Sequence, residues 1–231
     1  MIINRRKSIL PIVPALAISL LVMDESAHAA TVTTEFSAAG TFSTIANPAL
    51  DDLANGLGFG SGISRFHTTG NITGESLTDG DIVPTGFGVN ASNNTVDVRY
   101  KIDLGSSILI SSVNSYSWGN PTRAEQDFTL YGSSDPAAAT DFDPTNPIWT
   151  AIASVDLDNN PANGWGGSSI TDINASYQYL MWDTQAINLA SSTQQEHTIW
   201  KEFDVIAVPE PTTLAMASLA LLGTLRRRRS R

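Results

Sequence analysis

Residues 95–104, TVDVRYKIDL, carry the clearest structural pattern in the chain. Apolar side chains alternate with charged ones over the whole stretch. One face holds Val96, Val98, Tyr100, Ile102 and Leu104, and the other holds Asp97, Arg99, Lys101 and Asp103. A period of two is typical of a strand with one buried and one solvated face, as antiparallel sheets have. We therefore predict a half-buried antiparallel strand whose charged face meets water.

Similar segments recur along the rest of the chain. Gly105, Ser106 and Ser107 predict a turn, and the apolar residues after them predict the next strand, 108–113. Further strands are expected at 127–131, 148–157, 177–184 and 198–205, separated by clusters rich in Gly, Asn, Pro and Ser. Residues 35–89 are less regular: 49–57 are compatible with one short helix, and the rest with loops and edge strands. The pattern predicts one all-β antiparallel sandwich at residues 30–207.

The first 29 residues have the three parts of a secretory signal peptide. Arg5, Arg6 and Lys7 are followed by an apolar stretch at 9–23 and by Ala27-His28-Ala29, with small residues where a signal peptidase reads. The alternative is an uncleaved anchor, but the apolar stretch is short for a span of about 20 residues. We expect cleavage and export.

The C-terminal segment, residues 208–231, has the features of a second targeting signal. Pro209-Glu210-Pro211 precedes an apolar run at 214–225, and Arg226, Arg227, Arg228 and Arg229 follow. A helix over 212–225 would rise about 21 Å, short of the roughly 30 Å hydrocarbon core, and the arginines would stay in the cytoplasm. This predicts a hydrophobic helix that anchors the chain in the inner membrane.

This segment resembles the PEP-CTERM sorting domain in the type, order and position of its three parts. The resemblance implies that an exosortase, a membrane-embedded cysteine protease-transpeptidase, recognises Pro209, Glu210 and Pro211. The enzyme would remove the tail and release or transfer the protein to the cell envelope or extracellular matrix, after a transient stay in the membrane. Hosts of such systems typically make exopolysaccharide. A simple tail anchor would explain the helix and the arginines, but not the triplet.

Residues of about 95–206 resemble the discoidin, or galactose-binding-like, jelly-roll family. Four segments match in order: Tyr100–Gly105, Phe128–Asp135 with Trp149 downstream, Tyr179–Trp182 and Phe203–Val205. The resemblance implies a jelly-roll sandwich that binds ligands on loops at one end. It also implies a structural calcium ion in many members.

Charge and composition restrict the function classes. Between Ala30 and Val208 there are only five basic residues against 20 acidic ones, so binding to nucleic acid is not expected. The chain has no cysteine, which excludes disulfides and thiolate chemistry. No catalytic constellation is evident, and Gly60 stands where a Gly-x-Ser-x-Gly elbow needs its serine. We expect a protein that is not an enzyme.

A hard-cation loop is one candidate site. Asp156, Asp158 and Asn160 place three oxygen donors at alternate positions, as calcium loops do. However, Pro161 stands where an EF-hand needs glycine. The alternative is that these residues only form a turn.

Trp118 and Trp165 are the candidate ligand-stacking residues, with Arg123 as a polar partner. Both tryptophans lie on or beside glycine-containing segments predicted as loops, whereas Trp149, Trp182 and Trp200 are expected in the core. The leading hypothesis is an envelope or matrix module that binds carbohydrate or exopolysaccharide. Exposed Trp118 and Trp165 would favour it, and buried ones would favour a structural matrix or adhesion protein. A carboxylate pair brought together in space would favour an extracellular glycan hydrolase.

Overall fold

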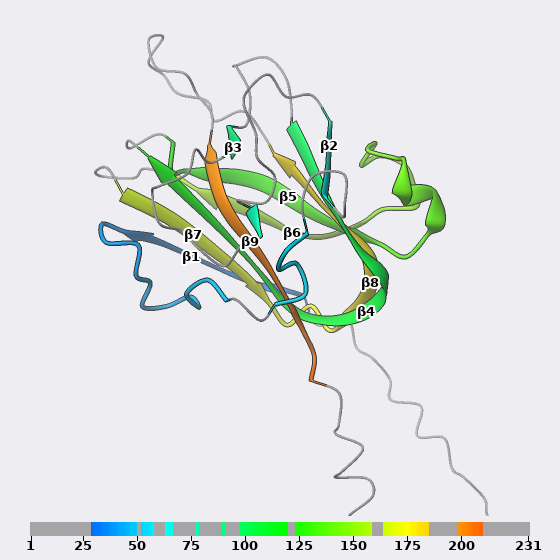
Figure 1. The fold of residues 1–231 in the computed structure, drawn as a ribbon, viewed down its shortest axis with the longest axis horizontal. Coiled ribbons are helices and arrows are strands. Elements are labelled where there is room, and N and C mark those ends of the chain that lie inside the picture. The colour runs from blue at the N-terminus through cyan, green and yellow to red at the C-terminus, as the bar shows by residue number, and fades with distance from the viewer. Residues whose placement is uncertain are drawn as a thin grey trace, which may run out of the picture.

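A computed structural model describes residues 29–49, 52–57, 63–66, 77–78, 89–90, 98–119, 123–158, 164–184 and 198–209. These residues form nine strands and one short 3-10 helix (Figure 1). In chain order they are β1 (Thr31–Ser37), β2 (Ile63–Phe66), β3 (Val89–Asn90), β4 (Val98–Gly119), β5 (Gln126–Ser133), η2 (Pro136–Ala139), β6 (Thr150–Leu157), β7 (Gly164–Thr171), β8 (Ala175–Thr184) and β9 (Ile199–Ala207). Every strand pairing is antiparallel, which confirms the predicted fold class.

Several predicted segments lie outside the described residues. They are nearly all of the signal peptide, the hydrophobic helix, the arginine cluster, and residues Asn160, Glu210 and Pro211. Among the residues that are described, no helix has the length and apolar character needed to cross a membrane.

The long strand β4 builds both layers of the sandwich. Its first half pairs with β2 and β8, and its second half pairs with β7 and β9. Strands β5 and β6 extend the first layer beyond β8, and β1 extends the second beyond β7. The core between the layers holds the predicted apolar face of β4, including Val98, Tyr100 and Ile102, each at most 1% exposed.

The turn predicted at 105–107 is wrong, because the chain bends there without reversing. Both halves of β4 continue along the same partner, with Asp103 opposite Tyr179 and Ile108 opposite Tyr177. Four residues on β4 therefore face a single residue on β8, and Gly105 takes a positive φ of 77° inside this bulge. The bulge lets one strand pass from the first layer to the second.

The tryptophans predicted for the core are buried. Trp182 stacks on Phe203 with ring centroids 4.4 Å apart, and its Nε1 donates a hydrogen bond to the hydroxyl of Ser115 at 2.9 Å. Trp200 is fully buried, and Trp149 is 6% exposed in a smaller cluster. Large aromatic side chains thus fill the space between the layers.

The charged face predicted for the start of β4 is only partly open to water. The segment 134–149 covers it, and Lys101 is only 2% exposed. The Lys101 ammonium donates hydrogen bonds to the carbonyls of Ala138, Ala139 and Asp141, and burial lowers its pKa to about 8. The prediction failed because alternation shows that two faces differ, and not what covers the charged one.

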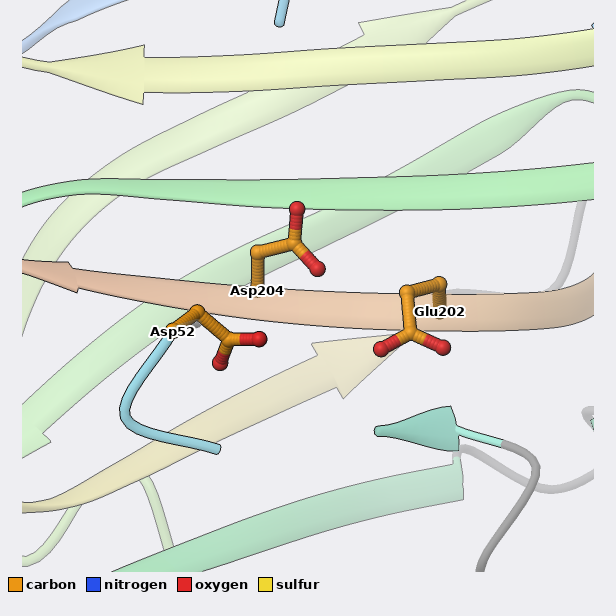
Figure 2. Close-up of side chains that lie close together, drawn as sticks. All are labelled: Asp52, Glu202 and Asp204. Atoms are coloured by element: carbon orange, nitrogen blue, oxygen red, sulfur yellow. The ribbon is translucent and has the colours of Figure 1, made fainter. Parts of the chain in front are cut away.

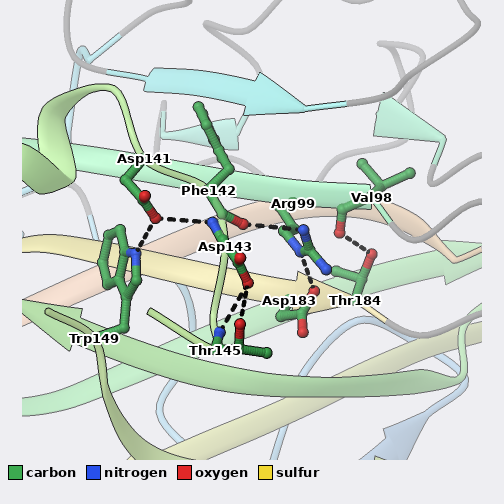
Figure 3. A network of polar contacts seen from close by, with 9 residues as sticks. All are labelled: Val98, Arg99, Asp141, Phe142, Asp143, Thr145, Trp149, Asp183 and Thr184. Atoms are coloured by element: carbon green, nitrogen blue, oxygen red, sulfur yellow. Dashed lines mark hydrogen bonds and ion pairs between the residues drawn. The ribbon is translucent and has the colours of Figure 1, made fainter. Parts of the chain in front are cut away.

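Arg99 fastens the same segment from the next position on this face. Its Nε donates to Asp183 at 2.6 Å and its Nη1 donates to the carbonyl of Phe142 (Figure 3). Within the segment, Asp141 accepts a hydrogen bond from the indole Nε1 of Trp149 at 2.9 Å. The two basic residues of β4 therefore hold a covering loop in place.

Strand β7 corrects a further prediction, since its glycine-rich sequence predicts a loop. A Cβ at Gly166 would overlap the carbonyl oxygen of Ala124, and one at Gly167 would overlap Ile45. Glycine has a low strand propensity, but here it allows other segments to approach both faces of the strand.

The short helix proposed for 49–57 is also wrong where the structure describes it. Residues 53–56 form a turn, and the amide of Leu57 donates to the carbonyl of Ala54, three residues earlier. The amide of Leu53 donates to the carbonyl of Val205 at 2.8 Å instead of continuing a helix. Docking on β9 therefore replaces helical hydrogen bonds.

The strand ends define two poles of the sandwich. At the loop pole, Trp118 near the end of β4 pairs with Trp165 at the start of β7, and β9 begins beside them. At the terminal pole, β1 begins with Thr31 opposite Thr171, and β9 ends with Ala207 opposite Ile110. The described chain thus enters and leaves at the same pole.

Candidate functional site

Residues 38–57 cover the outer face of the β7–β4–β9 layer where the structure describes them. Phe42 and Ile45 pack with Tyr116 and Trp165 in a separate buried cluster. The Glu35 carboxylate holds the start of this segment, because it accepts hydrogen bonds from the amides and hydroxyls of Ser43 and Thr44 at 2.7–2.9 Å.

Trp118 and Trp165 are neighbours, but only one of them is open to solvent. Their ring centroids are 6.1 Å apart, and they occupy paired positions in β4 and β7, not loops. Trp118 is 36% exposed, whereas Trp165 is 7% exposed beneath Gly40. Trp118 can therefore offer an aromatic surface to a ligand, and Trp165 supports it from below.

Two basic residues lie near the end of β4 that carries Trp118. The ammonium of Lys201 lies 5.6 Å from the centroid of the Trp118 ring, within the range of a cation–π interaction. The side-chain stem of Arg123 lies over Gly119, the residue after Trp118, which has no Cβ to obstruct it. Arg123 and Lys201 are thus both found near this end of β4, but Lys201 is only 4% exposed.

Lys201 was not identified from the sequence. The pairing of β4 with β9 changes register between Tyr116 and Ser117, and Lys201 lies opposite this change. A register shift of this kind cannot be predicted from the local sequence. Because Lys201 is only 4% exposed, it lies beneath the surface. We call the surface formed by Trp118 and Arg123 the ligand face.

Three carboxylates converge on the outer side of β9 and form what we call the carboxylate centre. Glu202 and Asp204 come from β9, and Asp52 comes from the covering segment (Figure 2). One oxygen from each lies within 4.8 Å of the others. Glu202 and Asp204 are fully buried, so their charges are removed from water.

The hydrogen bonds of the carboxylate centre are incomplete. Asp52 Oδ1 accepts from the amides of Ala54 at 2.6 Å and Val205 at 3.2 Å. Asp204 Oδ2 accepts from the amide of Ala49 at 3.1 Å and the hydroxyl of Tyr116 at 3.4 Å. Among the described residues, Asp52 Oδ2 and Asp204 Oδ1 are buried without a hydrogen-bond partner. Burying a carboxylate oxygen without a hydrogen-bond partner costs free energy, and a bound cation would offset this cost.

The pKa values of two of these carboxyl groups are raised. Burial, and next the charge of Asp52, raise the pKa of Asp204 to about 7, and burial also raises the pKa of Asp52. A donor set made of oxygens alone suits a hard cation such as Ca²⁺. A glycan hydrolase needs carboxylates that a sugar chain can reach, and two of these three, Glu202 and Asp204, are fully buried.

The side chains of the predicted calcium loop converge less than those of the carboxylate centre. Asp156 and Asp158 are exposed near the end of β6, and Asn160 lies outside the described residues. Asp127 lies opposite Asp156, and burial followed by the charges of Asp156 and Asp158 raises the pKa of Asp127. Within the described part of the chain, these residues do not form a group of three metal-ligating side chains, whereas the carboxylate centre does.

The sequence did not reveal the carboxylate centre because Asp52 is 150 positions from Glu202. One local signal was present. Glu202 and Asp204 occupy alternate positions of an otherwise largely apolar last strand, which places both on one face.

Comparison with known proteins identifies the C-terminal segment. Residues 207–229 match the family model described as the PEP-CTERM protein-sorting motif. The motif indicates an exported protein that is sorted to the cell surface, and it confirms the sorting segment predicted from Pro209, Glu210 and Pro211. No curated protein matches this chain in sequence.

Three solved structures illustrate what the chain is similar to in shape. CpGH89CBM32-6 produced by Clostridium perfringens is 17% identical, with 68% of this chain and 100% of that chain covered and a TM-score of 0.43. Chitosan-binding module 1 from a chitosanase/glucanase of Paenibacillus sp. IK-5 is 15% identical (68% and 98% covered, TM-score 0.43). The lectin domain of Lectinolysin, in complex with Lewis B antigen, is 14% identical (69% and 98% covered, TM-score 0.43).

Glu35 gives a prediction about acid stability. Burial tends to raise its pKa, but the four groups on Ser43 and Thr44 donate to the ionised carboxylate and hold the pKa at about 2. Since this pKa lies below the ordinary value of 4.5, the contribution of Glu35 is complete above pH 4.5 and is lost as the pH falls toward 2. Thermal unfolding midpoints measured from pH 7 to pH 2 should drop more steeply in this window for the parent than for Glu35→Gln. Equal slopes would refute the role of Glu35.

Proposed function

We propose that this exported protein binds carbohydrate at the ligand face, with Trp118 as the stacking surface and Arg123 as the polar partner. The observation that supports this most is the 36% exposure of Trp118. A flat indole offers an apolar surface to the C–H face of a sugar ring, and the guanidinium of Arg123 can donate hydrogen bonds to hydroxyl or carboxylate groups. Because the sorting motif directs the protein to the surface, the ligand we favour is exopolysaccharide of the producing cell.

The proposed route to the surface uses both ends of the chain. The signal peptide starts export, and the hydrophobic helix then holds the chain in the inner membrane for a time. An exosortase cuts at Pro209, Glu210 and Pro211 and frees the domain for the envelope or matrix. The basic residues Arg226–Arg229 mark the cytoplasmic end of the tail.

We also propose that a structural calcium ion occupies the carboxylate centre. Asp52, Glu202 and Asp204 would hold it, and the ion would offset their mutual repulsion. Its effect would be to fasten the covering segment to β9, since Asp52 belongs to the first and the other two to the second. The proposal rests on the two buried oxygens without partners.

A structural matrix or adhesion role is the alternative, and the burial of Trp165 favours it. With one tryptophan buried, the stacking surface is smaller than the sequence suggested. A catalytic role has less support, because two of the three carboxylates that converge are fully buried. We therefore propose a binding module that is not an enzyme.

The ligand face gives the first test of this function. Trp118→Ala should weaken retention on a panel of polysaccharides, including the exopolysaccharide of the producing cell, by about tenfold or more, as loss of a central aromatic contact does. Val32→Ala is the matched control, since Val32 is 38% exposed at the terminal pole. Failure of the parent to bind any polysaccharide would support the structural role.

The calcium site gives the second test. At a concentration 100 times its Kd, a bound ion stabilises the fold by about 2.7 kcal/mol, which raises the unfolding midpoint of a domain of this size by about 5–10 °C. We expect this rise for the parent after calcium is added to chelator-treated protein. Asp204→Asn should abolish it, whereas a variant with Asp156→Asn and Asp158→Asn should retain it. The reverse pattern would assign the ion to the predicted loop at 156–160.

Processing gives the third test. Mass spectrometry of the surface-bound or released protein should find a C-terminus that lacks Arg226–Arg229. An intact tail on this mature protein would contradict exosortase processing and would support a simple tail anchor.

A further inference from the structure

The last strand leads into the sorting motif without a spacer. Strand β9 ends at Ala207, and the amide of Val208 still donates to the carbonyl of Leu109 at 2.9 Å. The next residue, Pro209, is the first of the triplet. The sorting motif therefore begins directly after the last described hydrogen bond between the chain end and the sheet.

Side-chain contacts hold the same residues in the sheet. The hydroxyl of Ser111 donates to the carbonyl of Ile206 at 3.0 Å, and the carbonyl of Ala207 lies 3.3 Å away from it. Ile110, opposite Ala207, is fully buried. The strand end is thus fixed on β4 up to the motif itself.

This geometry limits where a processing enzyme can lie. An extended chain advances at most about 3.6 Å per residue, so Glu210 is within roughly 7 Å of Val208. A protease that encloses the triplet has a body far larger than this distance. It cannot reach the triplet while the strand end stays in the sheet unless it touches the terminal pole.

Exposed apolar side chains lie on the surface of the terminal pole. Among the described residues, the large hydrophobic side chains that are exposed are Val32, Leu109 and Trp118. Val32 lies at the start of β1, and Leu109, 42% exposed, lies where Val208 is bound. Because Leu109 is exposed and its carbonyl binds Val208, its side chain lies close to the start of the triplet, where an enzyme bound to the motif would contact it.

We infer that the terminal pole, centred on Leu109, is a docking surface for the membrane-embedded enzyme that processes the Pro-Glu-Pro triplet. This inference rests on the proposed sorting function and adds that the enzyme recognises the folded domain as well as the motif. The ligand face at the opposite pole then points away from the membrane during processing. The domain can engage matrix polysaccharide before the tail is removed.

Processing of the full chain, coexpressed with the sorting enzyme of its own cell, tests this inference. A pulse–chase experiment with mass spectrometry of the products measures the rate of tail removal. Leu109→Glu should slow removal about tenfold, because it places an unpaired charge in the contact. Ser154→Glu adds the same charge at an exposed position of β6 and should stay within twofold of the parent.

A spacer separates docking from folding defects. Ten Gly and Ser residues inserted between Val208 and Pro209 move the motif away from the pole, so Leu109→Glu should no longer slow removal in the spacer background. That rescue would also show that the variant folds and is exported. Equal rates for Leu109→Glu and the parent, both processed, would overturn the docking inference alone. A parent that keeps its tail would overturn the sorting function, and the inference with it.

Discussion

The fold depends on one constraint, that strand β4 belongs to both layers of the sandwich. The bulge between Asp103 and Ile108 bends the strand while it stays paired with β8. Its first half contributes Tyr100 to the core, and its second half contributes Val113. Because the layers share this backbone, they cannot separate without breaking β4, and this connection helps to hold together a domain that has no cysteine.

Polar contacts attach the segments that cover the outer faces of the two layers. Lys101 and Arg99 hold 134–149 on one layer, and Glu35 holds the start of the segment that covers the other. The carboxylate centre differs from these, since it joins negative groups with no described cation between them. Two basic residues and one acidic residue thus complete their contacts within the chain, whereas the proposed calcium site requires an ion from outside.

The two poles separate the two tasks we propose for the protein. The exposed indole of Trp118 lies at one pole, and the strand end that carries the sorting motif lies at the other. A rigid β9 of nine residues connects them, with a length of about 30 Å. Binding of a matrix polymer and processing at the membrane can therefore occur on the same molecule without competition for space.

The sequence by itself determined the all-β class, most of the strands from residue 98 onward and the sorting motif, because these depend on local periodicity or on contiguous residues. Tertiary structure alone decided that Lys101 is buried, that the glycines at 166 and 167 belong to a strand, and that Trp118 is exposed while Trp165 is covered. It also decided that Asp52 meets Glu202 and Asp204. The physical reason is that burial and convergence depend on which distant segment packs on a face, whereas alternation along a strand records only that its two faces differ.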